Sequence, residues 1–218
     1  MDIIKNFFQS AIVFFYEQTN SWGWSIIILT VLIKIVLFPS SVKQYRSMHK
    51  MKQLQPKLKE IQEKYKDKPE ELNRRTMELY QKENVSIFSG CLPMIFQMVI
   101  LIIFYRVLQD KNFIEMIGDA TFLGLVLKKN QYWQIALISG LTTFLQQKLT
   151  MPATGSDQQS QSFLYFMPLL FGYITFTLSA TIGIYWVASN IIGIIQQYII
   201  NEYFIVKEHI KERQENNN

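Results

Sequence analysis

The chain has 218 residues, of which 49% are apolar and 14% aromatic, yet its mean hydropathy is only +0.08, which indicates apolar runs separated by a very polar insertion. It carries 22 Lys and Arg residues against 17 Asp and Glu residues, a formal net charge of +5. The single cysteine, Cys91, excludes an intramolecular disulfide framework, and both histidines fall in polar stretches, so no metal site is expected.

Residues 1–20 are too polar to cross a bilayer, but their apolar side chains recur at helical spacing. These side chains are Ile3, Ile4, Phe7, Phe8, Ala11, Phe14 and Phe15. The pattern predicts an amphipathic helix that lies flat on the outer surface of a membrane. A signal peptide is the competing interpretation, but no small-residue cleavage site follows a basic segment and an uninterrupted apolar segment.

Five apolar runs approach the length of about 20 residues that a helix needs to cross a bilayer. They predict transmembrane helices over residues 21–39, 86–108, 132–149, 163–178 and 182–200. Tyr and Trp residues lie near the ends of several runs, as amphipathic rings do at membrane interfaces. The predicted fold class is therefore an all-α polytopic membrane protein.

The polar insertion at residues 40–85 is predicted to be a helical hairpin. Residues 39–85 contain 12 Lys and Arg against seven Asp and Glu, so they account for the whole net charge. Met51, Leu54 and Leu58 begin a series of apolar residues at helical spacing, and Pro69 suits the first turn of a second helix that runs to about Glu83. A charged helix of this kind is usually solvated or touches anionic lipid, so docking of a ribosome is the less favoured interpretation.

The charge distribution also predicts orientation. The positive-inside rule places the basic hairpin in the cytosol and the N-terminus outside. Alternation of the spans then places the loops 109–131 and 179–181 outside, and the loop 150–162 and the tail 201–218 in the cytosol. The tail is weakly basic and ends in three Asn residues, so we expect a frayed, solvated terminus.

Lys34 interrupts the first apolar run about one turn before Pro39. A lysine at a bilayer centre costs about 2.5–3.5 kcal/mol, so an intramembrane cation is a functional hypothesis by default. The alternative is that Lys34 snorkels to the nearby interface. Side chains lean towards a helix N-terminus, which in this topology points away from the nearer interface and weakens that alternative.

Other polar residues lie within the predicted spans. They are Thr30, Gln97, Gln146, Gln147, Asn190, Gln196 and Gln197. Amides and hydroxyls often serve only to join helices in lipid, at about 0.6 kcal/mol each. Several such groups around one cation nevertheless indicate a wet interior cavity.

Six segments of the sequence resemble the YidC membrane-insertase family, whose relatives include the Oxa-type and Alb-type insertases. They are WGWSIIILTVLIKIVLFPSSVKQYRSMHKM (22–51), LQP (54–56), GCLPMIFQM (90–98), FLQQK (144–148), FMPLLFG (166–172) and IGIYWVASNIIGIIQQ (182–197). The segments follow the order and spacing of the family over nearly the whole chain. The chain is similar to the compact five-span form of that family.

The resemblance implies a fold of five transmembrane helices around a hydrophilic groove that opens to the cytosol and to the inner leaflet. The implied groove residues are Lys34, Thr30, Gln97, Gln146, Tyr185 and Trp186. Lys34 stands where the family usually has arginine, so it keeps the charge but loses the planar fork that grips a carboxylate. Residues 85–89 also depart from the family's pattern, so the entry to the second span is expected to differ in shape.

The function implied is a membrane protein insertase and chaperone of the bacterial plasma membrane, with nascent membrane proteins and the lipid bilayer as partners. The ribosome, the signal recognition pathway and the Sec translocon stay open as further partners, and no nucleic-acid readout is expected. Insertion would need no cofactor, because no G-x-x-x-x-G-K-[ST] motif occurs. The Lys34 ammonium would attract a polar or acidic tail of the substrate.

Two other classes of protein compete with this interpretation. A small transporter or a passive assembly scaffold is the main alternative, although no repeat, broken-helix pair or acidic relay favours transport. An enzyme is not expected, and no catalytic residue is assigned, because the predicted spans contain no Asp, Glu or His.

Overall fold

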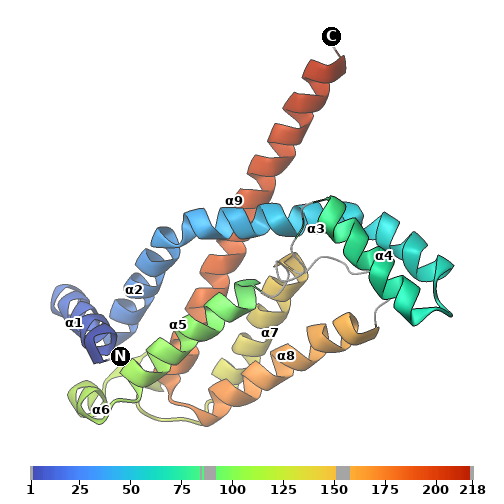
Figure 1. The fold of residues 1–218 in the computed structure, drawn as a ribbon. Coiled ribbons are helices and arrows are strands. Elements are labelled where there is room, and N and C mark those ends of the chain that lie inside the picture. The colour runs from blue at the N-terminus through green and yellow to red at the C-terminus, as the bar shows by residue number, and fades with distance from the viewer. Residues whose placement is uncertain (1, 84, 86–91, 151–157, 217–218) are drawn as a thin grey trace.

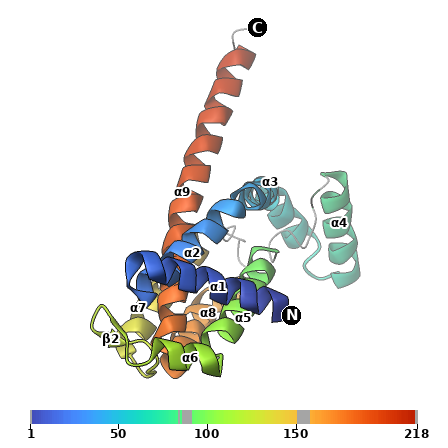
Figure 2. The same cartoon turned by 90° about the vertical axis from the view of Figure 1, so that its left-hand side faces the viewer.

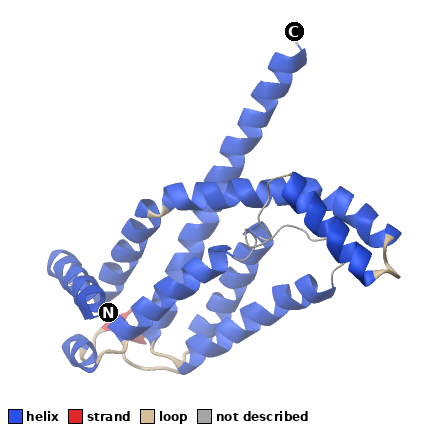
Figure 3. Ribbon diagram, in the orientation of Figure 1, coloured by secondary structure: helices blue, strands red, loops and turns tan. Residues whose placement is uncertain are grey.

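The computed structural model describes residues 2–83, 85, 92–150 and 158–216, and among these it contains nine helices and one short β-hairpin (Figures 1 and 3). The all-α class predicted from the sequence is confirmed. The first residues of the predicted second span, most of the predicted loop 150–162 and the departure at 86–89 lie outside the described residues.

Five helices correspond to the five predicted spans. They are α2 (Trp22–Val36), α5 (Leu92–Leu108), α7 (Trp133–Thr150), α8 (Gln158–Thr177) and α9 (Ala180–Asn216). By length and apolar composition, the described part of the chain contains one helix that can cross a membrane, Ala180–Tyr203, or two if α2 and the helix after it are one bent span. Ile95–Leu108 and Leu164–Thr177 are shorter apolar helices. The number of five spans therefore stays a prediction.

The chain bends where α2 meets α3 (Phe38–Lys64), and the two helices differ in direction by 59°. Pro39 lies in the first turn of α3 and has no backbone N–H, so the hydrogen-bond ladder of α2 cannot continue through it. The last hydrogen bond of α2 is the one that the Leu37 N–H donates to the Ile33 carbonyl, at 2.9 Å. The bend turns α3 across one end of the bundle (Figure 1).

The predicted helical hairpin consists of α3 and α4 (Pro69–Lys82), which has Pro69 in its first turn. A small apolar cluster joins its two arms. The cluster comprises Met51, Leu54, Leu58, Tyr80 and Val85. An exposed ion pair between Lys57 and Glu83, at 2.8 Å, adds a second link between the arms.

The end of the bundle opposite α3 is closed by a packed aromatic and aliphatic core. The loop 109–131, for which no secondary structure was predicted, contains α6 (Lys111–Ile117) and a hairpin of β1 (Thr121–Phe122) and β2 (Leu125–Val126) at this end (Figure 2). Phe113 and Leu127 from this loop are 1% and 0% exposed and pack with Phe104 of α5. The segment is ordered because its apolar side chains complete the core.

Helix α1 (Asp2–Thr19) matches the predicted N-terminal helix and packs on α2 and α5. Tyr16 stacks on Trp22 with ring centroids 3.9 Å apart, and Phe8 meets Phe104 edge to face. Ile3 and Phe7 remain exposed, which suits contact with lipid at a membrane surface.

An ion pair links α1 to the start of α6, at the packed end of the bundle. Lys5 Nζ lies 2.7 Å from Asp110, which also accepts a hydrogen bond from the Phe113 N–H at the start of α6. The hydrogen bond from Lys5 is the main cause that lowers the pKa of Asp110 below its ordinary value. A carboxylate with a lowered pKa stabilises the fold above its unfolded pKa, and the stabilisation disappears as pH falls through the folded value.

When the pH falls from 5 to below about 4, we therefore expect the thermal midpoint of the wild-type chain in detergent to fall by more than that of Asp110→Asn. The asparagine keeps an acceptor for the α6 cap but has no charge to lose. Thermal midpoints of both chains, measured at each pH, test the effect. Equal acid dependence of the two chains would assign the loss to other carboxylates.

Helices α7 and α8 approach closely through two glycines. A Cβ added at Gly172 would lie 3.2 Å from the Ala136 carbonyl oxygen, and one added at Gly140 would lie 3.3 Å from the Pro168 carbonyl oxygen. Small residues allow backbones to approach in this way within membranes. The crossing fixes α7, which carries several polar residues of the site described below.

The tail differs from the expectation of a frayed terminus, because α9 continues as one helix to Asn216 (Figure 1). Residues 201–216 contain no Gly or Pro and several Glu, Lys and Arg, which are good helix formers. The helix therefore extends beyond the bundle on the side of α3.

Candidate functional site

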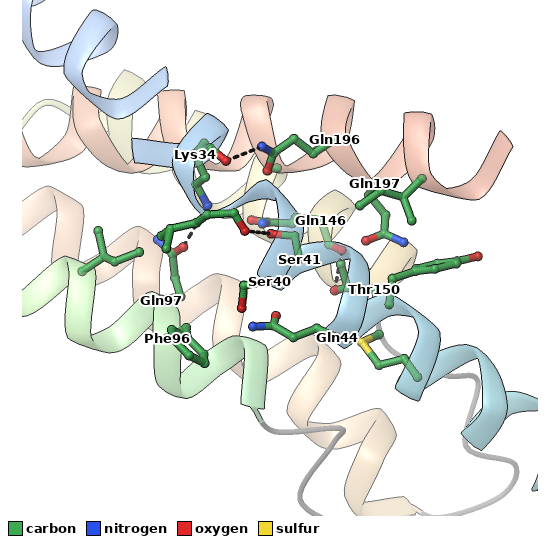
Figure 4. A pocket seen from close by; sticks show the side chains of 16 residues that line it. Lys34, Ser40, Ser41, Gln44, Phe96, Gln97, Gln146, Thr150, Gln196 and Gln197 are labelled. Carbon is green, nitrogen blue, oxygen red and sulfur yellow. Dashed lines mark hydrogen bonds between the residues drawn. The ribbon is translucent and has the colours of Figure 1, made fainter. Parts of the chain in front are cut away.

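A polar pocket of about 120 Å³ lies beneath the α2–α3 bend (Figure 4). Its walls come from α2, α3, α5, α7 and α9. The lining residues with polar side chains are Lys34, Ser40, Ser41, Gln44, Tyr45, Gln97, Gln146, Thr150, Gln196 and Gln197. This volume is large enough for several water molecules. Among the described residues that line it there is one cation and no Asp or Glu, so the pocket is suited to an anion or a neutral polar group.

Lys34 is held inside the bundle by two other helices. Its ammonium donates to Gln97 Oε1 of α5 at 3.1 Å, and its backbone carbonyl accepts from Gln196 Nε2 of α9 at 2.8 Å (Figure 4). Gln97 Nε2 in turn donates to Ser189 Oγ at 3.2 Å and lies 3.4 Å from the Tyr185 hydroxyl. The cation is thus oriented by a neutral amide, and among the residues that the structure describes no salt bridge is formed with it.

A second set of hydrogen bonds joins α7 to α9 beside the pocket. The Trp186 indole N–H donates to Thr143 Oγ1 at 2.9 Å. The amide of Asn190 is satisfied at both ends when its oxygen accepts from Thr143 Oγ1 at 2.9 Å and its nitrogen donates to Gln146 Oε1 at 2.6 Å. Asn190 is 1% exposed, so water could not take the place of its amide as a hydrogen-bond partner if the amide were removed. The network orients Gln146 on the pocket wall.

We expect Asn190→Ala to lower the free energy of unfolding by about 1 kcal/mol, because it leaves buried partners on α7 unpaired. Denaturation midpoints in mixed micelles measure this change. Asn130→Ala is the matched control, since Asn130 is exposed and its amide donates to the Thr177 carbonyl at 3.3 Å. Equal losses in the two variants would show that burial of the amide is irrelevant.

Of the six predicted groove residues, three line the pocket and three do not. Lys34, Gln97 and Gln146 line the pocket. Tyr185 lies behind Gln97 and stacks on Phe104 with centroids 4.0 Å apart. The remaining two are buried away from the pocket wall, Thr30 donating to the Ile26 carbonyl and Trp186 stacking on Phe171.

Several pocket residues were not assigned to the groove from the sequence. Ser40, Ser41 and Gln44 belong to α3, and Thr150 is the last residue of α7. One signal was present, since the two serines and Gln44 are neutral polar residues at the start of an otherwise basic segment. Gln196 and Gln197 were recognised only as polar residues within a span.

The side chains that line the pocket can bind a polar group through hydrogen bonds. Within the described ranges, no group of three or more His, Cys, Asp or Glu is placed to hold a metal ion. Amides and hydroxyls, which can both donate and accept hydrogen bonds, line the wall together with the Lys34 ammonium. Such a surface can solvate a polar segment within an apolar bundle.

The model of the 60Kd inner membrane protein family matches residues 14–208. A membrane protein insertase YidC of Campylobacter jejuni is 35% identical over 198 residues, which are 91% of this chain and 37% of that protein. The corresponding protein of Francisella philomiragia is 36% identical over 203 residues, 91% of this chain and 36% of its own length. The chain thus spans a little over a third of the length of these curated relatives.

A solved structure has the same fold. It is described as an active YidC insertase crystal structure with the first transmembrane domain resolved, and its TM-score with this chain is 0.71 at 23% sequence identity. The match covers 88% of this chain and 46% of the other. At this level of identity, the likeness bears on the helical architecture.

Proposed function

This chain belongs to the 60Kd inner membrane protein family, and from that membership and the pocket around Lys34 we propose that it is a membrane protein insertase and chaperone. It inserts newly made membrane proteins into the bacterial plasma membrane and helps them fold. The pocket is the part of a hydrophilic groove that receives the polar or acidic tail of the substrate.

One observation carries the proposal: a cation that has no acidic partner among the described residues lines a polar pocket inside an apolar bundle. Lys34 and neutral amides and hydroxyls provide hydrogen bonds there, and no carboxylate competes for the ammonium among the described lining residues. Outside the pocket, α2, α7 and α8 expose large apolar side chains. Examples are Val36, Leu141 and Leu169. A substrate can therefore keep its polar end solvated while its apolar segment follows the outer surface.

The mechanism uses no nucleotide. A short acidic tail enters the pocket and loses less solvation there than it would in lipid, because the amides and hydroxyls replace water. Burial of the apolar segment in the bilayer then releases about 25 cal/mol per Å² of apolar surface. A membrane potential that is positive outside adds about 2.3 kcal/mol per negative charge for each 100 mV. Lys34 attracts the tail, and hydrophobic burial drives the transfer.

The orientation follows from the same proposal. The α3–α4 hairpin and the C-terminal part of α9 lie on the cytosolic side, where the basic residues concentrate, and α6 with the β-hairpin lies outside. Nascent chains then meet the hairpin first. The ribosome, the signal recognition pathway and the Sec translocon are the partners to examine at this surface.

Reconstitution tests the function directly. The purified chain is incorporated into liposomes. A single-span substrate with a short acidic tail is synthesised in their presence, and no nucleotide is added beyond the amount that its synthesis requires. We expect protection of the tail from external protease above the level of protein-free liposomes. Background protection, combined with proton-coupled solute uptake by the same vesicles, would favour a transporter instead.

A further inference from the structure

A side chain of α9 binds the backbone of Lys34 at the end of α2. The Lys34 carbonyl is among the last four of α2, which have no N–H partner in a regular helical ladder. Gln196 Nε2 donates to this oxygen at 2.8 Å (Figure 4). In a regular helix its partner would be the N–H of Phe38, which is the first residue of α3 and lies beyond the bend. Gln196 adds a side-chain hydrogen bond to this carbonyl at the bend.

The position of the Lys34 ammonium depends on the backbone at this bend. Its bond to Gln97 is 3.1 Å long, close to the upper end of the range of about 2.7–3.2 Å for N–H···O hydrogen bonds. A rotation of the last turn of α2 that moves the ammonium by about 0.5 Å is enough to break it. Without a fixed carbonyl, the long lysine side chain has other rotamers and a nearby interface available.

We propose that Gln196 is a positioning residue, which directs the Lys34 ammonium into the pocket by holding the Lys34 carbonyl. This inference rests on the proposed insertase function and adds to it the origin of its preference for acidic tails. Gln196 does not need to touch the tail. It determines how strongly the pocket distinguishes an acidic tail from a neutral tail of the same size.

A structural tie and a positioning role predict different results. If Gln196 only joins α2 to α9, its loss lowers the insertion of every substrate in proportion to the loss of folded protein. If it positions the cation, its loss selectively lowers the insertion of acidic tails. The ratio of acidic-tail to neutral-tail insertion separates the two roles, because the amount of folded protein cancels.

The test uses Gln196→Met, which has nearly the same length but no donor, in reconstituted vesicles. Two single-span substrates are compared. Their tails are identical except that one contains two Asp residues where the other contains two Asn residues. We expect the wild-type chain to prefer the acidic tail and Gln196→Met to lower the insertion ratio about fivefold, the weight of one hydrogen bond. The control is Ile195→Met, because the neighbouring Ile195 is exposed and does not line the pocket. Its ratio should equal that of the wild type.

A double-mutant cycle then shows whether Gln196 acts through Lys34. In a Lys34→Gln background the ratio is already low, and adding Gln196→Met should leave it unchanged. A further fall in that background, or an unchanged ratio in Gln196→Met alone, overturns the positioning role. A wild-type chain that inserts neither substrate overturns the insertase function together with the positioning role, and this result is distinct from a wild-type preference that Gln196→Met retains.

Discussion

Replacement of Lys34 by Glu should reduce the insertion of a substrate with an acidic tail by more than about tenfold, because like charges brought together at low dielectric cost several kcal/mol. Lys34→Arg keeps the cation and should remain active, and Lys34→Gln should fall between the two. The measurement is complementation of an insertase-depleted bacterium, together with insertion of a single-span substrate. Growth and protease protection are scored for each variant.

The Lys34 series needs two controls. Membrane levels of each variant are measured, so that a loss of folded protein is not counted as a loss of insertion. A substrate with a neutral tail should be inserted nearly equally by all four chains. If wild type, Arg, Gln and Glu insert the acidic substrate equally at normal abundance, Lys34 is a snorkelling residue and the mechanism rests on pocket hydration alone.

Replacement of Gly172 by Leu should be the most destabilising single change at the α7–α8 crossing. A Cβ added at Gly172 would lie 3.2 Å from the Ala136 carbonyl oxygen of α7, and backbone cannot move aside as a flexible side chain can. Overpacking of this kind costs about 1–3 kcal/mol or more, so we expect a large fall in the thermal midpoint and little accumulation in membranes. Thermal unfolding in detergent and membrane abundance measure the effect.

Two further variants keep this prediction testable if Gly172→Leu does not accumulate. Gly172→Ala adds only the Cβ and should show a smaller loss in the same direction. Tyr173→Leu changes the neighbouring residue, whose side chain is 67% exposed, and should change the midpoint little. Equal midpoints for Gly172→Leu and Tyr173→Leu would show that α7 and α8 can separate at no cost.

Local chemistry allowed part of the fold to be predicted. A second hairpin helix was expected to have Pro69 in its first turn and to run to about Glu83, and α4 spans Pro69–Lys82. The match is close because proline at a first helical turn depends on the backbone alone. The loop 109–131 could not be predicted in the same way, because α6 has only seven residues and its order depends on the burial of Phe113 in the distant core.

Only part of the candidate site could be predicted from the sequence, because the rest depends on how the helices are arranged. Trp186 and Tyr185 are adjacent in sequence, but they belong to different sets of hydrogen bonds on α9. Ser40 and Ser41 reach the pocket because the chain bends at Leu37, whereas the sequence indicated only that the first span ends near Pro39. The magnitude and direction of a bend are tertiary properties. The role of the six predicted residues in substrate binding remains a prediction.

The packed end of the bundle has an electrical consequence. Phe104, Phe113, Leu127 and Ile182 are at most 1% exposed, and they fill the end opposite the α2–α3 bend. An ion that crossed such a layer would lose its hydration without gaining a partner, at a cost of many kcal/mol. The bundle can therefore contain a polar pocket at one end and still be a barrier to ions at the other. A membrane that contains many copies would therefore keep its proton gradient at rest.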